Sequence, residues 1–296
     1  MRRMTGQLQT AELLAVTQIN AQLLLDTVAK HPADWQVQWG AAELLVEWPN
    51  KQRFYEAALA ASGTNEAVVL RFACAAARHR QDPLAFAWLR HSEKRDTDNL
   101  VPWLVEVWLR YQAVHDVDAP VEAILPDKPP AWATVFRDHG PSAARARIRL
   151  LELAGYSPYA ARRLGFMPEL YPTVMARELA GKHLADSARP LLIGVAKSMQ
   201  LAPAFLLTEL VGESLEQTAM SNESGPSRPE TRFRAVELDR RRTEIKELIA
   251  GVERNAVEFA TEEEMVRYFD ELLLYGEQEA MLRLLHAVGK TPPAAK

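Results

Sequence analysis

The chain of 296 residues contains one cysteine, 13 glycines and 7 histidines, and these low counts limit its chemistry. Cys74 has no partner for an intramolecular disulfide, and its apolar neighbours predict a buried thiol inside a helix rather than a nucleophile. The histidines are scattered without a paired spacing such as His-Glu-x-x-His, so no metal site is expected. Scarce glycine argues against a turn-rich β architecture.

The sequence also lacks a strong excess of charge of one sign and has no long apolar runs. The net charge of −4 excludes a globally basic nucleic-acid binder but leaves a local basic face open. No apolar run approaches the length of a membrane span and no secretory signal begins the chain, so we expect a cytoplasmic protein without membrane contact. Paired carboxylates, a serine triad and a glycine-rich phosphate cradle are not evident. We therefore expect no catalytic residue and no cofactor, although a helical enzyme without a recognisable motif stays open.

Apolar residues recur every three to four positions through most of the chain, and this periodicity predicts an all-α fold. Ser157 before a proline and Thr261 before three acidic residues indicate helix starts. The expected helices cover about 10–29, 34–48, 51–61, 66–79, a segment from Asp82 and another from Pro102, then 131–138, 142–154, 158–165, 168–180, 184–200, 203–218, 232–259, a segment from Thr261, and 277–288.

The first third of the chain has an internal period of 34 residues, the length of two short helices. At this shift Pro49 coincides with Pro83, Phe54 with Trp88, Asn65 with Asn99 and Leu70 with Leu104. The period resembles the tetratricopeptide repeat over residues 32–115. Ala85, Leu89 and Ser92, and similarly Tyr55 and Ala58, occupy positions where that family has small and large packing residues. The sequence departs from the family at Thr97 and Gly63, where proline is usual, and at Lys51, where alanine is usual.

All seven tryptophans precede residue 133, which indicates a distinct N-terminal part: Trp35, Trp39, Trp48, Trp88, Trp103, Trp108 and Trp132. Large aromatic side chains fill the space between stacked helical hairpins, so we expect most of them in the core. An aromatic groove for a peptide is the functional alternative.

The predicted architecture is therefore all-α, with antiparallel helical hairpins stacked as a short α-solenoid and a further hairpin at the C-terminus. We expect a tetratricopeptide-like hairpin array over 1–118, a second helical block over 119–218, a serine- and proline-rich linker over 219–231, a helical hairpin over 232–290 and a tail over 291–296.

A segment around 142–165 resembles a helix-turn-helix DNA-binding motif. Gly155 would supply the left-handed turn, Ser157 the cap and Leu164 the inward anchor. The large Leu151 departs from the pattern, and an ordinary capped hairpin explains the same residues. Four arginines are the candidate contacts for a partner or a nucleic acid: Arg145, Arg149, Arg162 and Arg163.

A second basic run follows the expected linker, with arginines at 232, 234 and 240–242. Interleaved acidic residues favour a solvated helix face held by pairs four residues apart, and contact with an acidic partner is the alternative.

These observations favour a protein-interaction or scaffold module whose partner is another protein or a peptide. This step rests on analogy between folds, because stacked hairpins present a surface to other proteins. A nucleic-acid-binding regulator that uses the arginines of 142–165 is the alternative, and a helical enzyme without a motif is the third.

Overall fold

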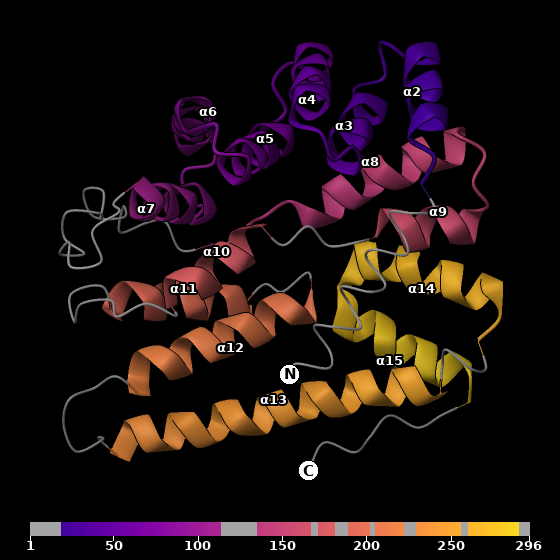
Figure 1. Cartoon of the computed structure of the whole chain (residues 1–296). Coiled ribbons are helices and arrows are strands. Elements are labelled where there is room, and N and C mark those ends of the chain that lie inside the picture. Colours follow the sequence, from indigo (N-terminus) through magenta and orange to yellow (C-terminus); the bar gives the residue numbers. More distant parts are fainter. Residues whose placement is uncertain are drawn as a thin grey trace. The chain divides into compact units, whose positions relative to one another are not determined.

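The computed structural model describes residues 19–113, 135–166, 171–180, 189–201, 205–221, 229–255 and 260–289. Within these ranges the chain forms helices α2 to α15 and no strand (Figure 1). An isolated bridge between Asn99 and Val135 is the one β-type pairing of this described part. The expected all-α class of packed helical hairpins is confirmed.

The helices belong to two compact units, and each unit is built from two separate stretches of sequence. Unit 1 combines Met1–Val68 with His139–Glu169, and unit 2 combines Val69–Asp138 with Leu170–Lys296. The predicted blocks, in contrast, follow one another along the chain. The grouping differs because α8, from the middle of the sequence, packs on α2 and α3 near its start.

The described residues of unit 1 form five complete helices: α2 (Ala21–Lys30), α3 (Trp35–Leu44), α4 (Trp48–Ser62), α8 (Gly140–Leu153) and α9 (Pro158–Gly165). Short polar side chains begin three of them. Asn20, Asp34 and Ser157 accept hydrogen bonds from backbone N–H groups in the first turns of α2, α3 and α9. Helix α3 is the centre of the unit, because α2, α4 and α8 all pack against it.

The crossing of α3 and α8 depends on a glycine. A Cβ atom at Gly40 would stand 2.4 Å from the carbonyl oxygen of Ala146, so no larger residue fits there without a shift of α8. Gly165 plays the same part where α9 meets α8, since a Cβ atom there would stand 2.9 Å from the backbone nitrogen of Ile148. Small residues therefore let the backbones of the three helices approach closely.

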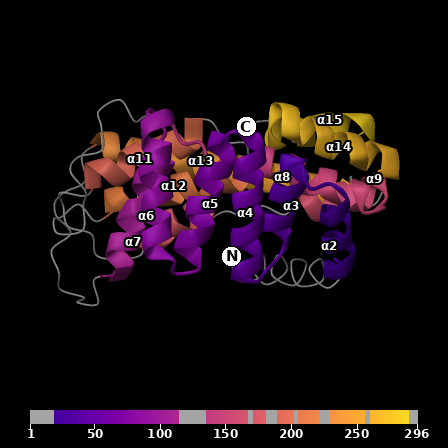
Figure 2. The ribbon, with the colours of Figure 1, turned by 90° about the horizontal axis from the view of Figure 1, so that it is seen from above.

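Unit 2 contains α6 (Asp82–Arg95), α7 (Val101–Ala113), α10 (Tyr171–Ala180), α11 (Arg189–Leu201), α12 (Leu206–Ser221), α13 (Pro229–Asn255), α14 (Glu262–Tyr275) and α15 (Glu277–Ala287). Helix α5 (Glu66–Arg78) begins in unit 1 and continues into unit 2. Within unit 2, α12 lies between α11 and α13, and α15 packs against α13 and α14 (Figures 1 and 2).

Helix α14 begins with the expected cap. The Thr261 hydroxyl accepts from the Glu264 N–H at 3.2 Å, and the Glu264 carboxylate accepts from the Thr261 N–H at 2.7 Å. This reciprocal pair is a capping box, and it separates α14 from the residues before it. The C-terminal hairpin expected over 232–290 corresponds to three helices, α13, α14 and α15, of which α14 and α15 pack against each other.

Two expected segments are wrong in part. Residues 135–138 of the expected helix over 131–138 are not helical, because the Val135 backbone pairs with Asp98 and Leu100 at 3.0 and 2.8 Å. The expected linker over 219–231 loses both ends to helices, since α12 continues to Ser221 and α13 begins at Pro229. Proline is favoured in a first turn, where its missing N–H has no intrahelical partner. Residues 10–18, 131–134, 222–228 and the tail over 291–296 lie outside the described residues.

Candidate functional site

The candidate arginines lie on α8 and α9, and at least two of them are engaged within unit 1. Arg149 donates to Asp34 from Nε at 2.9 Å and from Nη2 at 2.6 Å. Arg162 donates to Glu152 at 2.7 Å and to the Pro158 carbonyl at 3.2 Å. Arg145 and Arg163 are exposed. Since carboxylates neutralise two of the four cations, this face carries less positive charge than the sequence indicates.

The turn between α8 and α9 has the expected local geometry. Gly155 has a φ of 88°, the Ser157 hydroxyl caps α9 through the Ala160 N–H at 3.3 Å, and Leu164 is 4% exposed. Helix α9 is eight residues long. These features describe a capped helical hairpin, and they leave DNA binding a hypothesis.

A hollow of about 160 Å³ lies in unit 1 beside the crossing of α3 and α8. Two indole rings form one side of it, because Trp35 and Trp39 stack with centroids 6.0 Å apart and planes inclined by 18°. We call it the tryptophan hollow, and its lining consists of Trp35, Gln36, Trp39, Asn65, Ala67, Ser142 and Arg145.

The tryptophan hollow combines an apolar wall with a cationic group. Among its lining residues Arg145 alone carries a charge, and Gln36, Asn65 and Ser142 add amide and hydroxyl groups. Pockets for whole metabolites and cofactors usually measure roughly 300–1,000 Å³. The tryptophan hollow is smaller, and its size matches one or two side chains of a larger molecule.

A buried polar network fixes the wall of the tryptophan hollow. The Trp39 indole N–H donates to Glu43 Oε1 at 3.1 Å, and the Tyr55 hydroxyl donates to the same oxygen at 2.9 Å. Arg147 donates from Nη1 to Glu43 Oε2 at 3.1 Å and from Nε to the Gly165 carbonyl at 2.6 Å. Trp39 is 1% exposed. Its ring is therefore held in place before any ligand arrives.

The sequence did not reveal this network. Glu43, Tyr55 and Arg147 belong to three different helices, and the Arg147–Glu43 contact spans 104 positions. The one available signal was the charge of Glu43 and Arg147 on otherwise apolar helix faces. Charged side chains in such positions are rarely fully buried without a partner.

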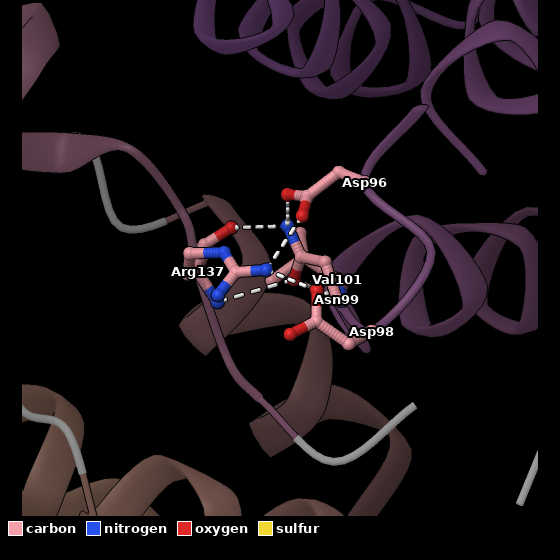
Figure 3. A network of polar contacts seen from close by, with 5 residues as sticks. All are labelled: Asp96, Asp98, Asn99, Val101 and Arg137. Carbon is pink, nitrogen blue, oxygen red and sulfur yellow. Dashed lines mark hydrogen bonds and ion pairs between the residues drawn. The ribbon is translucent and has the colours of Figure 1, made fainter. Parts of the chain in front are cut away.

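A second polar network lies in unit 2, where the loop between α6 and α7 meets residues 135–137 (Figure 3). Asn99 is its centre. Its Nδ2 donates to Asp96 Oδ2 at 2.8 Å and to the Arg137 carbonyl at 2.9 Å, while its Oδ1 accepts from the N–H groups of Arg137 and Val101 at 3.1 and 3.0 Å. Arg137 completes the network through ion pairs with Asp96 and Asp98.

Every polar group of Asn99 is used inside the protein, so this network holds the chain and offers no reactive group. Asp96 and Asn99 are 8% and 4% exposed. The hydrogen bonds that Arg137 donates, first to Asp96 and then to Asp98, raise the pKa of its guanidinium. The role of the network is to fasten residues 135–137 to the end of α6 and the start of α7.

The basic run of α13 is only partly a solvated face. Arg240 lies near Glu244 at 3.6 Å as expected for residues four apart. Arg234 and Arg241, however, turn towards α12: Arg234 donates to Glu216 at 3.0 Å and Arg241 to Glu209 at 2.7 Å. The interpretation as a fully solvated face is wrong at these two positions, because α12 presents buried carboxylates to them.

The described part of the chain has no group of three or more histidine, cysteine, aspartate or glutamate side chains arranged to hold a metal ion. Cys74 is fully buried in α5. None of the described helices is long and apolar enough to cross a membrane.

Comparison with known proteins gives no relative from which a role could be transferred. No protein-family model matches the chain, and neither a curated protein nor a solved structure does.

Proposed function

We propose that the chain is a protein-interaction module that anchors a peptide segment of a partner protein in the tryptophan hollow. The observation that carries this proposal is the stacked Trp35–Trp39 pair beside the exposed Arg145. Tryptophan and arginine are the side chains most enriched among residues that dominate protein interfaces. The resemblance of residues 32–115 to tetratricopeptide repeats supports the same class by analogy of fold.

The chemistry of the lining defines the peptide. The indole wall favours an apolar side chain, and the guanidinium of Arg145 favours a carboxylate next to it. We therefore expect a short segment with an aliphatic or aromatic residue adjacent to an acidic residue or to a free C-terminus. Gln36 and Asn65 offer amide groups to a peptide backbone that passes the hollow.

Preorganisation supports binding at this site. Trp39 is held by Glu43, which is in turn held by Tyr55 and Arg147. A wall that is already ordered loses little side-chain entropy when a ligand binds, so even a small contact gives measurable affinity.

The test is a selection of displayed peptides on the immobilised full chain, followed by titration of the enriched peptides. Trp35→Ala should weaken their binding at least about tenfold, and Arg145→Glu should do the same for acidic peptides. Arg163→Glu is the matched control, because Arg163 is an exposed arginine on α9 that does not line the hollow. Failure to enrich any peptide, or equal loss in the control, would overturn the proposal.

Nucleic-acid binding through Arg145, Arg149, Arg162 and Arg163 is the second candidate, supported by the turn geometry of Gly155 and Ser157. Its support is weaker because Arg149 and Arg162 already pair with carboxylates. Titration with duplex DNA at several salt concentrations separates the two candidates, since phosphate contacts weaken steeply as salt rises. We expect no salt-dependent DNA binding, and any such binding should disappear in the Arg162→Ala, Arg163→Ala double variant if these residues carry it.

A further inference from the structure

Helix α12 buries three glutamates where it packs between its neighbours in unit 2. Glu209 and Glu213 are one helical turn apart and are 5% and 1% exposed. We call them the acidic pair. Carboxylates at this spacing lie on the same face of a helix and repel each other when both are ionised.

The hydrogen bonds of the acidic pair are incomplete. Glu209 Oε1 accepts from Arg241 Nε at 2.7 Å. The other oxygen, Glu209 Oε2, is buried without a partner, and so is Glu213 Oε2. A buried ionised oxygen without a donor is strongly unfavourable. A proton on Glu213 removes this charge and turns one of its oxygens into a hydrogen-bond donor.

The cations around the acidic pair are largely committed to other groups. On α13, Arg234 bonds with Glu216, Glu237 and Gln200, whereas Arg241 bonds with Glu209 and Gln278 and lies near Glu244. Arg242 is the third cation of α13 near Glu213, and its Nη2 is buried without a partner.

Among the described residues of the other elements, the charged groups near α12 lie beside partners other than Glu213. Lys197 of α11 lies near Glu216, and Glu178 of α10 accepts from the Trp108 indole at 2.7 Å. Glu277 of α15 accepts from the Leu206 N–H at 2.7 Å. Burial first, and then the charge of Glu209, raise the pKa of Glu213 to about 7. The arginines of α13 act in the opposite direction but do not cancel this rise.

We propose that the contact between α12 and α13 is proton-dependent: Glu213 holds a proton while the helices are packed, and loss of that proton loosens α13 from α12. The proton sits on a Glu213 oxygen and removes one of the two neighbouring buried negative charges. When it leaves, two buried negative charges remain one turn apart, and Arg241 and Arg242 must rearrange or α13 must move outward. The feature is a conformational switch near neutral pH, independent of the tryptophan hollow.

The direction of the effect follows from proton linkage. The folded state holds the Glu213 proton up to about pH 7, whereas the unfolded state releases it near the usual value of 4.5. The stability of this contact therefore falls as pH rises between these values and is constant above them.

Hydrogen–deuterium exchange of the full chain tests the proposal at about pH 6 and about pH 8.5, after correction for the intrinsic exchange rate. The protection of α13 should fall by up to about tenfold at the higher pH, relative to the protection of α14. Glu213→Gln keeps the shape and the hydrogen-bond donor of the protonated acid, so α13 should stay protected at both pH values. An unchanged pH response in this variant overturns the proposal.

Glu216→Gln is the matched control on the same helix. It should lower the protection of α13 at both pH values and leave the pH response in place, because it removes the partner of Arg234 rather than the titrating group. A ¹³C NMR titration of the glutamate carboxyls in the wild-type chain gives an answer that does not depend on how variants fold. Titration of Glu213 near the value of an exposed glutamate would overturn the proposal.

Discussion

Arg147 on α8 and Glu43 on α3 form an ion pair of 3.1 Å in which the two side chains are 3% and 0% exposed. Glu43 also accepts hydrogen bonds from Trp39 and Tyr55. One carboxylate thus connects α3, α4 and α8. The pair therefore fastens the second stretch of unit 1 to the first.

Replacing Arg147 with methionine should destabilise unit 1 strongly. The substitution leaves Glu43 as an uncompensated charge in the core, which costs about 3–5 kcal/mol in comparable buried pairs. Urea unfolding measures the change. Arg149→Met is the control, because Arg149 lies on the same helix as Arg147 and pairs with Asp34 at the start of α3, while its side chain is 50% exposed. That loss should stay within about 1 kcal/mol, and equal losses in the two variants would contradict the assignment.

Two glycines of unit 2 should respond to alanine with opposite signs. A Cβ atom at Gly212 on α12 would stand 2.8 Å from the Ala196 carbonyl oxygen of α11, whereas one at Gly194 would meet nothing within 4 Å. Gly212→Ala should cost about 1–3 kcal/mol through overpacking. Gly194→Ala should stabilise by about 0.5–1 kcal/mol, because alanine is favoured within a helix. Thermal unfolding of both variants checks the signs.

Asn99→Ala should release residues 135–137 from the loop between α6 and α7. The substitution removes two donated and two accepted hydrogen bonds, and the freed N–H groups of Val101 and Arg137 lose their side-chain acceptor. The expected loss is about 1–3 kcal/mol, with faster amide exchange at Val135. Asp98→Ala is the control, since the Asp98 side chain is 49% exposed and its ion pair contributes about 1 kcal/mol or less. A larger loss of stability in Asp98→Ala than in Asn99→Ala would exclude Asn99 as the centre of this polar network.

Local elements were predictable from the sequence because their signals are local. The apolar spacing of 158–165 and the residues Ser157 and Thr261 predicted α9 and the start of α14, and the structure confirms these features. A proline-rich composition was a poorer guide. Residues 229–231 were assigned to a linker, yet Pro229 begins a 27-residue helix.

Long-range partners were not predictable from the sequence. The chemistry of a side chain indicates which kind of bonding partner it requires, but not which distant residue supplies that partner. Asp96 and Asn99 lie in the loop between α6 and α7, and nothing in their chemistry identified Arg137 as the partner 38 or more positions later. Trp35 and Trp39 were expected in the core with a groove as the alternative. Trp39 is buried as expected, and the hollow beside it became visible only once α8 brought Arg145 and Ser142 to α3.

The capping box of α14 predicts a separable effect at Thr261. Thr261→Ala removes the hydroxyl acceptor of the Glu264 N–H and should cost about 1 kcal/mol. Thr261→Ser keeps the acceptor and should restore most of that stability. The Thr261 N–H and hydroxyl also hold the pKa of Glu264 below its usual range. The Ala variant should therefore show a higher Glu264 pKa in an NMR titration, and an unchanged pKa would contradict the box.

Glu216 and Glu213 should give the contact between α12 and α13 opposite responses to pH. Glu216 is buried, which by itself favours the neutral acid, but hydrogen bonds from Arg234 and Gln200 outweigh burial and hold its pKa below the usual range. Its contribution to stability is therefore complete above about pH 4.5 and is lost as pH falls through the lowered pKa.

Glu216→Gln should destabilise the neutral protein by about 1.5–3 kcal/mol, the usual value of a hydrogen bond to a charged group. It should also remove part of the loss of stability in acid, because the variant has no proton to take up at this position.

Glu213→Gln should leave the loss of stability in acid unchanged and raise stability on the alkaline side of pH 7 by up to about 3 kcal/mol, the equivalent of the Glu213 pKa shift. Urea midpoints from pH 3 to 9 measure both limbs. Two variants with parallel pH profiles would show that the arginines of α13 do not distinguish the two carboxylates.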